Sequence, residues 1–536
     1  MKKIMKRTMA ALLIAAMLLP LSACDKKQQI SGEQALEIYV WDAGYGIAWM
    51  EANIEAFKQL DWVKEKYPNL QIKFVTNDQA NYAETRVTAG AANSIDLLYS
   101  TALSGLYKEY CEDLSQSLYN SEVPGEGVLY KDKLHRYALE CYEYTDNTGK
   151  ATGQYFTAAW ATGLTSYVYN ETLFETLGLS VPRTTDEMVA LCQQVKDMGG
   201  SNPAYPYTYS IISSKIGYSD RLNDVWWSQY DGIDGYKNYY NAIAPDGTRN
   251  SADIFEEKGR LETTKVFESL YKKGNGYFDR TSPNYEFIQG QTRMLTGEGL
   301  MMACGEWFSA EMRDLAVEYE KRGFNYQLRM MKLPVISSII DKTATITDDA
   351  MLSQVIADID AGLTTPSNSA VSAEDFEIVR NARGVFSTRD GMGHNAVIPN
   401  YSDAKELAVD FLRYMATDQA LQIYTEKTYG GITPFQYDIE TDFPDLHQKM
   451  MTEYKKTYVL LNDVAKMLNT DYAQGVYVSS PLKDYGDFNA WMKGLESAFM
   501  SDESVTAEQL IAEHKEYWLG NNGKNFKNAL SLAGMS

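Results

Sequence analysis

The chain has 536 residues, of which 45% are hydrophobic and 12% aromatic, and its formal net charge at pH 7 is −22. A chain of this length and composition can form two or more domains with a large apolar core. A strongly acidic surface repels nucleic acid and anionic lipid, so the composition argues against a nucleic-acid-binding protein.

The first 23 residues form a targeting segment. Four basic residues precede the apolar run Met9–Leu19, which Pro20 ends. A membrane-spanning helix needs about 20 apolar residues, so this shorter run predicts a secretory signal peptide. Leu21 to Cys24 resembles a bacterial lipobox, which implies cleavage before Cys24, lipid attachment to Cys24 and anchoring on the extracellular face of the cell membrane. The alternative is an ordinary signal peptide followed by a chance cysteine.

Removal of this segment takes away four positive charges and brings the net charge to −26. The polar residues 24–35 then form a short lipidated tether. Four cysteines remain beyond Cys24, without the spacing of a metal site. Cys111, Cys141, Cys192 and Cys304 can form disulfides or serve as small buried apolar residues.

Residues 36–158 read as alternating strands and helices. Strands are expected at 36–41, around 70–74 and at 95–100, with helices at about 47–60 and 79–92. This order predicts a mostly parallel sheet flanked by helices, and ligands of such sheets bind beyond the carboxyl ends of the strands. The candidate ligand-binding residues at those ends are Trp41, Asp42, Tyr45, Asp78 and Tyr99.

Residues 154–200 contain the most specific sequence pattern in the chain. An extended run, 155–169, leads to a short helix that Gly178 can end, and Thr184 can cap the next helix. The segments Tyr169-Asn170, Leu173-Phe174, Gly178-Leu179 and Pro182-x-Thr184-x-x-Glu187 resemble a signature of the extracellular solute-binding proteins of bacterial ABC importers (carbohydrate-type, family 1). Thr185 departs from this signature, which usually has Trp there.

Three later segments also resemble this family. Residues 295–307 resemble a strand that ends at a glycine and is followed by a ligand-facing aromatic, here Trp307. Residues 384–400 are poor in helix formers and resemble a crossing between lobes. Helices at 404–415 and from Asp418, ended near 430–434, complete the order. The resemblance therefore extends over essentially the whole mature chain.

The resemblance implies a two-lobed α/β fold of the periplasmic-binding-protein type, in which each lobe is a mostly parallel sheet flanked by helices and the chain crosses the hinge several times. The expected divisions are a first lobe (36–158), a second lobe (159–383, with a helical insertion at about 340–378), a crossing that returns to the first lobe (384–435) and a helical tail packed mainly on the second lobe (436–536).

The resemblance also implies a ligand and a partner. A sugar or oligosaccharide would be bound between the lobes and delivered by a monomer to the permease of an ABC importer. No cofactor and no metal-binding residue is expected, and the sequence leaves open whether a structural metal ion is bound. Flat aromatic rings suit the C–H faces of a sugar, and carboxylates suit its hydroxyls. Trp160, Trp226, Trp227, Glu306 and Trp307 therefore join the candidate ligand-binding residues.

Enzyme function has little support in the sequence. His135, His394, His447 and His514 are widely spaced and are interpreted as surface or local packing residues. Neither a nucleophile elbow nor a phosphate-binding loop occurs. Two alternatives stay open: a receptor of the same fold for a peptide or polyamine, and a surface adhesion or sensor protein without a transporter.

Overall fold

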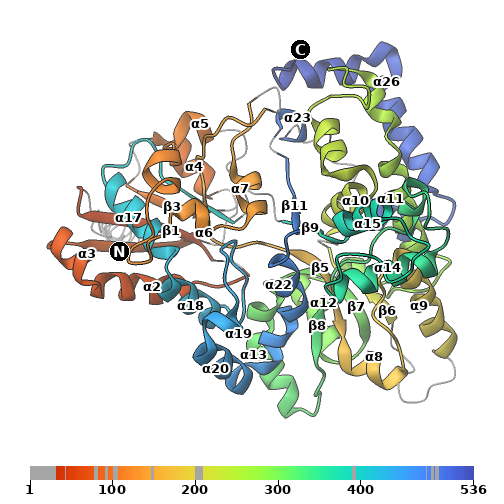
Figure 1. Ribbon diagram of the computed structural model, residues 1–536, viewed down its shortest axis with the longest axis horizontal. Helices are drawn as coiled ribbons and strands as arrows, with labels where there is room; N and C mark the ends of the chain where they lie inside the picture. The colour runs from red at the N-terminus through yellow and green to blue at the C-terminus, as the bar shows by residue number, and fades with distance from the viewer. Residues whose placement is uncertain are drawn as a thin grey trace, which may run out of the picture.

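The computed structural model describes residues 32–42, 44–77, 82–90, 94–100, 107–146, 150–199, 209–215, 217–388, 394–478, 480–484, 488 and 494–535. Two lobes lie side by side, each built around one β-sheet (Figure 1). Cys24 and Asp78 lie outside the described residues. Among the helices that are described, none combines the length and apolar character that crossing a membrane requires.

Lobe 1 is organised around a five-stranded sheet in the order β2-β1-β3-β10-β4. Its strands are β1 (Ala35–Trp41), β2 (Gln71–Asn77), β3 (Leu97–Ser100), β4 (Ala158–Ala159) and β10 (Asn395–Val397). The interior strand β1 is buried from Ala35 to Val40, as expected for a strand covered on both faces. It pairs in parallel with β2 and β3, so that Ile38 lies opposite Phe74 and Leu97.

Helices from two distant parts of the chain cover the lobe 1 sheet (Figure 1). They are α2 (Ala48–Gln59), α3 (Asp61–Lys66), α4 (Tyr82–Thr88), α5 (Tyr107–Tyr110), η2 (Ser115–Tyr119), α6 (Tyr130–Lys133), α7 (Arg136–Tyr142), α17 (Lys405–Met415) and α18 (Asp418–Lys427). Met50, Ile54 and Phe57 form the buried face of α2, as the helical spacing predicts. Helix α4 lies within the predicted helix at 79–92, of which residues 79–81 and 91–92 are outside the described residues.

Lobe 2 contains a six-stranded sheet. Its strands are β5 (Thr165–Asn170), β6 (Tyr209–Ile212), β7 (Gly299–Gly305), β8 (Leu328–Met330), β9 (Val385–Ser387) and β11 (Gln474–Val476). The central strand β5 is antiparallel to β7, β8 and β9, whereas β6 is parallel to β7 and β11 is parallel to β9.

The two-lobed α/β fold is confirmed, but the sheets are mixed rather than mostly parallel. In lobe 1, β10 runs antiparallel to both β3 and β4. The reason is the path of the chain. Strands β5 and β10 each enter a sheet from the other lobe, and a strand that arrives in this way needs no right-handed helical crossover from its neighbour.

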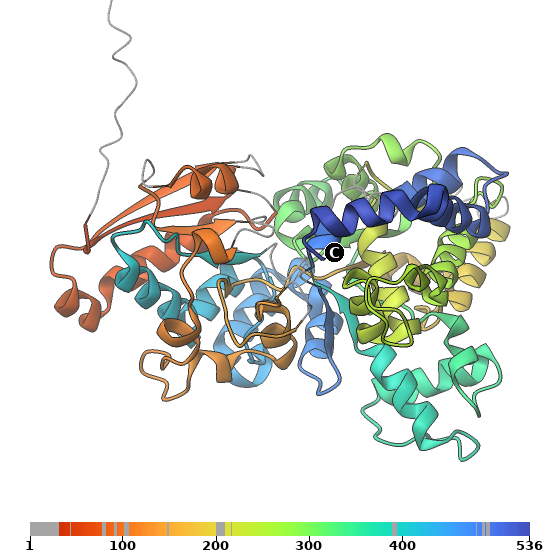
Figure 2. The ribbon, with the colours of Figure 1, turned by 90° about the horizontal axis from the view of Figure 1, so that it is seen from above.

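Lobe 2 carries most of the remaining helices. They are α8 (Glu171–Leu177), α9 (Thr185–Met198), α10 (Ser219–Tyr240), η3 (Ala252–Glu256), α11 (Lys258–Tyr271), η4 (Ser282–Asn284), α12 (Phe287–Leu295), α13 (Phe308–Lys321), η5 (Ser337–Lys342), α14 (Asp349–Asp360) and α15 (Ala373–Arg383). Figure 2 shows α14 and α15 at the periphery of lobe 2, away from lobe 1.

The helix boundaries expected in the stretch 154–200 are confirmed. The side chain of Asn170 accepts a hydrogen bond from the backbone N–H of Leu173 and begins α8, and Gly178 ends α8 in the left-handed conformation (φ 66°). Thr184 caps α9 by accepting from the backbone N–H of Glu187 at 3.1 Å.

The chain passes between the two sheets three times: between β4 and β5, between β9 and β10, and between α18 and β11. The elements after α18 are α19 (Ile439–Asp442), α20 (Pro444–Glu453), α21 (Lys455–Tyr458), η6 (Val459–Leu461), α22 (Asn462–Leu468), α23 (Pro481–Asp484), α25 (Leu495–Ser501) and α26 (Ala507–Leu532). Helix α20 contacts α18 of lobe 1, whereas α25 and α26 pack on α11 of lobe 2.

Candidate functional site between the lobes

The loop that follows β1 brings lobe 1 against lobe 2. Gly44 in this loop has a positive φ of 32°, which favours glycine. A Cβ atom on Gly44 would lie 3.0 Å from the Cβ of Trp307, so the loop approaches the indole as closely as a backbone can. The next residue, Tyr45, is buried. The loop thus holds Tyr45 at the junction of the two lobes.

Strand β7 positions two residues from the side of lobe 2. All seven of its residues are buried, and Glu306 and Trp307 follow directly. A Cβ atom on Gly305 would lie 2.2 Å from the ring of Trp307. The indole therefore folds back over Gly305, and any other residue at that position would push the ring away.

Five aromatic side chains meet at this junction, and we call them the inter-lobe aromatic cluster. Its members are Tyr45, Trp160, Trp307, His394 and Tyr424. The ring centroid of Tyr45 lies 5.7 Å from that of Trp160, 6.3 Å from that of Trp307, 5.2 Å from that of His394 and 6.2 Å from that of Tyr424. All five side chains are buried. Edge-to-face contacts dominate, an arrangement that aromatic pairs favour.

A second layer of rings in lobe 1 supports the cluster. Trp49 of α2 stacks on Trp160 with a centroid distance of 4.8 Å and an interplanar angle of 13°. Tyr99 of β3 lies 5.9 Å from Trp160 on another side. Trp49 also donates its indole N–H to the carbonyl of Gly46 at 3.0 Å, which ties this layer to the loop that carries Tyr45.

Glu306 provides the carboxyl group of the site and is fully buried. Its Oε1 accepts hydrogen bonds from the Tyr45 hydroxyl and, at 3.1 Å, from the backbone N–H of Gly163. Burial raises the pKa of Glu306 to about 8, against the lowering effect of these hydrogen bonds. The carboxyl group is therefore largely protonated at neutral pH and can donate as well as accept.

Several buried polar atoms in and around the cluster lack hydrogen-bond partners within the described structure. They are Glu306 Oε2, Trp160 Nε1, Tyr424 Oη and Tyr99 Oη. A buried polar group without a partner costs about 1–3 kcal/mol, so proteins retain few of them. These four atoms are available for hydrogen bonds to water or to a ligand that enters the junction.

The structure brings together four of the ligand-binding residues expected from the sequence: Tyr45, Trp160, Glu306 and Trp307. Tyr99 contacts Trp160 edge to face in the supporting layer. Trp41 is half-buried and packs with Tyr39 in a separate cluster, apart from the main core that holds Val40. Asp42 is exposed. Neither Trp41 nor Asp42 joins the cluster.

Trp226 and Trp227 also lie elsewhere, which corrects their assignment to the site. Both side chains are 0% exposed and belong to the core of lobe 2. Trp226 donates its indole N–H to the carbonyl of Pro334 at 3.0 Å, and Trp227 donates to Asp231 at 2.9 Å. The pair is a candidate from the sequence because flat aromatic rings suit the faces of a sugar, but both indole N–H groups have hydrogen-bond partners inside the lobe.

Three residues of the site were missed by sequence reasoning. Trp49 and Tyr424 lie on α2 and α18, where an aromatic at helical spacing resembles an ordinary core residue. His394 was interpreted as a surface or local packing residue, whereas it lies buried in the cluster. Its position in the predicted crossing 384–400 was the available signal.

The cysteines and the acidic and histidine side chains of the described residues do not indicate a second functional site. Cys111, Cys141, Cys192 and Cys304 are buried free thiols, and burial raises the pKa of each to about 12. The described residues contain no group of three or more His, Cys, Asp or Glu side chains able to hold a metal ion.

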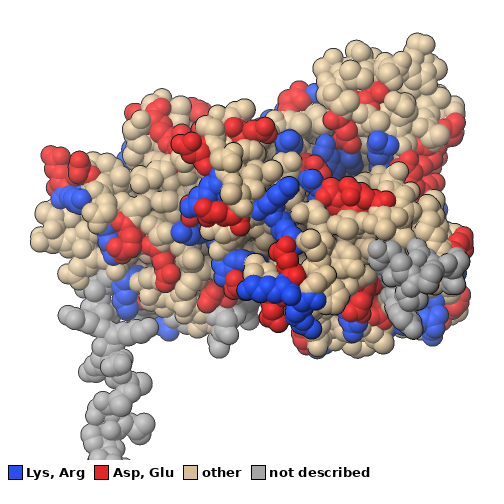
Figure 3. Space-filling model, turned by 90° about the horizontal axis from the view of Figure 1, so that it is seen from below, with Lys and Arg blue, Asp and Glu red and all other residues tan. Residues whose placement is uncertain are grey.

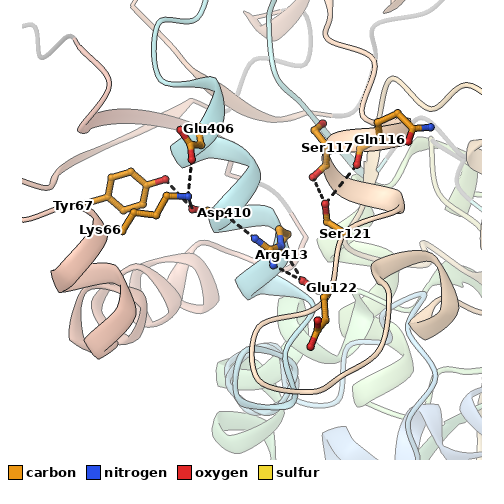
Figure 4. A network of polar contacts seen from close by, with 9 residues as sticks. All are labelled: Lys66, Tyr67, Gln116, Ser117, Ser121, Glu122, Glu406, Asp410 and Arg413. Carbon is orange, nitrogen blue, oxygen red and sulfur yellow. Dashed lines mark hydrogen bonds and ion pairs between the residues drawn. The ribbon is translucent and has the colours of Figure 1, made fainter.

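Two surface hollows lie outside the cluster. One is lined by residues of the third crossing and of α19 and α22, including Ile432, Asp438 and Lys466. The other lies on lobe 1 between α3, η2 and α17. Its charges pair with one another: Asp410 accepts from Lys66 at 2.6 Å, from Tyr67 at 2.8 Å and from Arg413 at 3.0 Å (Figure 4). The polar groups of this network are already satisfied.

Comparisons with known proteins agree with this architecture. A family model described as "Bacterial extracellular solute-binding protein" matches residues 54–446. None of the curated proteins matches the chain in sequence.

Several solved structures share the fold. The unliganded form of RafE from Streptococcus pneumoniae has a TM-score of 0.54 and 14% identity, over 93% of this chain and 100% of that one. The GacH receptor of Streptomyces glaucescens has a TM-score of 0.55 and 13% identity, over 94% and 99%. The ABC substrate-binding protein Lmo0181 from Listeria monocytogenes has a TM-score of 0.52 and 12% identity, over 94% and 99%.

Proposed function

The chain belongs to the family of bacterial extracellular solute-binding proteins, and from this premise we propose that it captures a sugar or oligosaccharide between its lobes and delivers it to the permease of an ABC importer. The family consists of binding proteins that act outside the cell, and no catalytic step is part of the proposal.

The observation that carries the proposal is the inter-lobe aromatic cluster together with Glu306. A sugar ring presents C–H groups on its faces and hydroxyls around its rim. The rings of Trp160 and Trp307 suit the faces, and the partnerless Trp160 Nε1, Tyr424 Oη and Glu306 Oε2 suit the hydroxyls. Because the cluster is contributed by both lobes, a ligand bound there would be enclosed when they close.

The relatives support the choice of a carbohydrate. RafE was solved in complex with raffinose, GacH in complex with acarbose, and Lmo0181 in complex with cycloalternan. These three proteins share the fold of this chain at 12–15% identity, so their ligands indicate a class of solute and not a particular sugar.

We also propose that the protein is held at the cell surface by a lipid anchor. Cleavage after residue 23 and lipid attachment to Cys24 would anchor the protein on the outer face of the membrane. We further propose that the chain divides between its lobes at boundaries near 158, 383 and 435.

Acidic and basic side chains are mixed over the face shown in Figure 3, so this face lacks the continuous positive charge that nucleic-acid binding needs.

A cationic ligand such as a polyamine is disfavoured by the state of the carboxyl group. A carboxylate would form an ion pair with an ammonium group, whereas burial raises the pKa of Glu306 to about 8 and favours its neutral form. The exposed Asp42 lies outside the cluster.

The test is a thermal-shift screen of the purified protein with raffinose, acarbose, cycloalternan and β-D-galactose, followed by calorimetry, with peptides and polyamines in the same panel. A ligand at 100 times its dissociation constant stabilises the folded state by about 2.7 kcal/mol. We expect a glycan to raise the melting temperature. A response to peptides or amines alone would contradict the sugar assignment, and a response to none of the compounds would favour an adhesion or sensor protein.

A further inference from the structure

Glu306 joins three parts of the chain that the fold brings to the lobe junction. The residue follows β7 of lobe 2, and its Oε1 accepts from the Tyr45 hydroxyl of lobe 1 and from the Gly163 N–H of the first crossing. Its own backbone N–H donates to the carbonyl of Leu164 at 2.9 Å. Among the described side chains, Tyr45 is thus the lobe 1 hydrogen-bond donor to this carboxyl.

The described groups that contact or electrostatically influence the carboxyl group are apolar or neutral. Phenol groups approach from α7 (Tyr137), from α18 (Tyr424) and from the first part of the third crossing (Tyr437), and burial together with the charge of Glu306 raises the pKa of each. The ring centroid of His394 lies 5.2 Å from that of Tyr45. Within the described chain Glu306 takes part in no ion pair, so only hydrogen bonds can compensate its burial.

A ligand that enters between the lobes must separate Tyr45 from Glu306 and Trp307, because the loop at Gly44 already touches the indole. The carboxyl group would then lose the phenol donor, and it would be buried again, now against the ligand, when the lobes close. A ligand that supplies a hydroxyl at this point restores the hydrogen bond, whereas an analogue without that hydroxyl leaves the group unsatisfied. Glu306 Oε2, which has no partner in the described structure, offers a second point of contact.

We propose that the Glu306 carboxyl is the group that selects ligands by their hydroxyls: the Tyr45 hydroxyl latches the lobes together by binding to it, and a ligand hydroxyl takes the same place when the lobes close on a ligand. The inference deepens the proposed function and rests on it for the ligand, but the latch itself is independent of any ligand.

The latch has a pH dependence whose direction follows from burial. The pKa of Glu306 is raised to about 8 in the closed arrangement, against an ordinary value of 4.5. The closed form therefore holds a proton that an opened, hydrated carboxyl releases. Closure is fully favoured below about pH 4.5, and this advantage is lost as the pH rises to about 8.

The matched variants are Glu306→Gln, Glu306→Leu, Tyr45→Phe and the control Glu496→Gln. Glutamine keeps an acceptor for Tyr45 and a donor for a ligand hydroxyl but cannot ionise. Leucine removes both functions. Glu496 is buried like Glu306, and its pKa is also raised to about 8 by burial, but it accepts from Ser213 inside lobe 2.

Small-angle X-ray scattering of the protein without ligand measures the latch. We expect the radius of gyration of the natural chain and of Glu496→Gln to increase between pH 5 and pH 9. Glu306→Gln should stay compact at both pH values, and Glu306→Leu and Tyr45→Phe should be expanded at both. A radius of gyration that does not depend on pH or on Tyr45 would overturn the latch, and Tyr45→Phe decides the question if Glu306→Leu does not fold.

Calorimetry tests whether Glu306 selects ligands by their hydroxyls. The ligand is the glycan that gives the largest thermal shift. At pH 6 we expect Glu306→Leu to bind at least tenfold more weakly, and Glu306→Gln and Glu496→Gln within about threefold of the natural chain. Unchanged affinity in Glu306→Leu would overturn the inference while leaving the proposed function intact. If no glycan binds and the scattering behaves as expected, the proposed function fails and the latch stands.

Discussion

Trp307 shows how much of the site depends on single side chains. Its indole lies over Gly305, touches the Gly44 loop and faces Tyr45, Tyr218 and His394. A flat ring in contact with both lobes can cover one face of a sugar. We infer that this ring supplies a large part of the ligand contact area.

Replacing Trp307 by alanine should weaken glycan binding more than tenfold, because the stacking surface is lost while the neighbouring rings remain. Calorimetry of the variant checks this. Trp62→Ala is the matched control, since Trp62 of α3 packs on Phe57 in lobe 1 and outside the cluster. Equal affinity in Trp307→Ala and the natural chain would exclude Trp307 from the site.

Two buried carboxyl groups predict the pH dependence of stability. Burial raises the pKa values of Glu306 and Glu496 to about 8 from an ordinary 4.5. Between these values the folded protein holds protons that the unfolded chain has released, so the free energy of unfolding decreases as the pH rises from about 4.5 to 8.

Glu496→Gln removes one of these two ionisations. The decrease in melting temperature between pH 5 and pH 8 should therefore be smaller in this variant than in the natural chain, as measured by differential scanning calorimetry. An identical decrease in both proteins would show that Glu496 ionises normally in the folded state.

Sequence reasoning selected Tyr45 because it follows a strand that the hydrophobic pattern predicts, Glu306 and Trp307 because their segment resembles the family, and Trp160 because an aromatic ring suits the face of a sugar. It also selected Trp226 and Trp227, because composition cannot distinguish a tryptophan that faces a cleft from one inside a lobe. The actual distinction is physical: both indole N–H groups find partners in lobe 2, whereas that of Trp160 finds none in the described structure.

At the scale of elements, the ends of the strands decide where the site lies. Strand β7 ends at Gly305, and the chain turns at once into α13 with Glu306 and Trp307 in the turn. Strand β1 ends before the Gly44 loop and α2. The two turns meet because the sheets face each other across the three crossings.

Gly305→Ala tests this geometry. A Cβ atom at this position would lie 2.2 Å from the Trp307 ring, so the indole must leave its place. We expect a loss of glycan affinity comparable to that of Trp307→Ala. Gly494→Ala is the control, because nothing lies within 4 Å of a Cβ atom there and its φ is negative. Natural affinity in Gly305→Ala would mean that the ring position does not matter for binding.

Most helices and strands could be predicted from the sequence. Whether a strand runs parallel or antiparallel to its neighbours could not. The caps at Asn170, Gly178 and Thr184 are local, since each depends on one side chain or one backbone angle. The antiparallel strands β5 and β10 depend on which lobe the chain arrives from. That information lies in contacts between residues hundreds of positions apart, and no short window contains it.

At the scale of the whole molecule, the lobes are joined by three passes of the chain and by the aromatic cluster between them. This construction allows the lobes to separate while the crossings keep them together. A ligand shifts the balance toward closure only as far as it binds the closed form more tightly than the open one. The central claim is therefore that the glycan binds between the two lobes, and the question is whether it does.

Hydrogen–deuterium exchange, with and without the glycan that gives the largest thermal shift among those named above, answers it most directly. The account predicts slower exchange in three separate segments, at 44–50, 158–165 and 299–308, and no change in the peripheral helices α14 and α15. Protection confined to α14 and α15, or to the hollow lined by Ile432, Asp438 and Lys466, would contradict a site between the lobes.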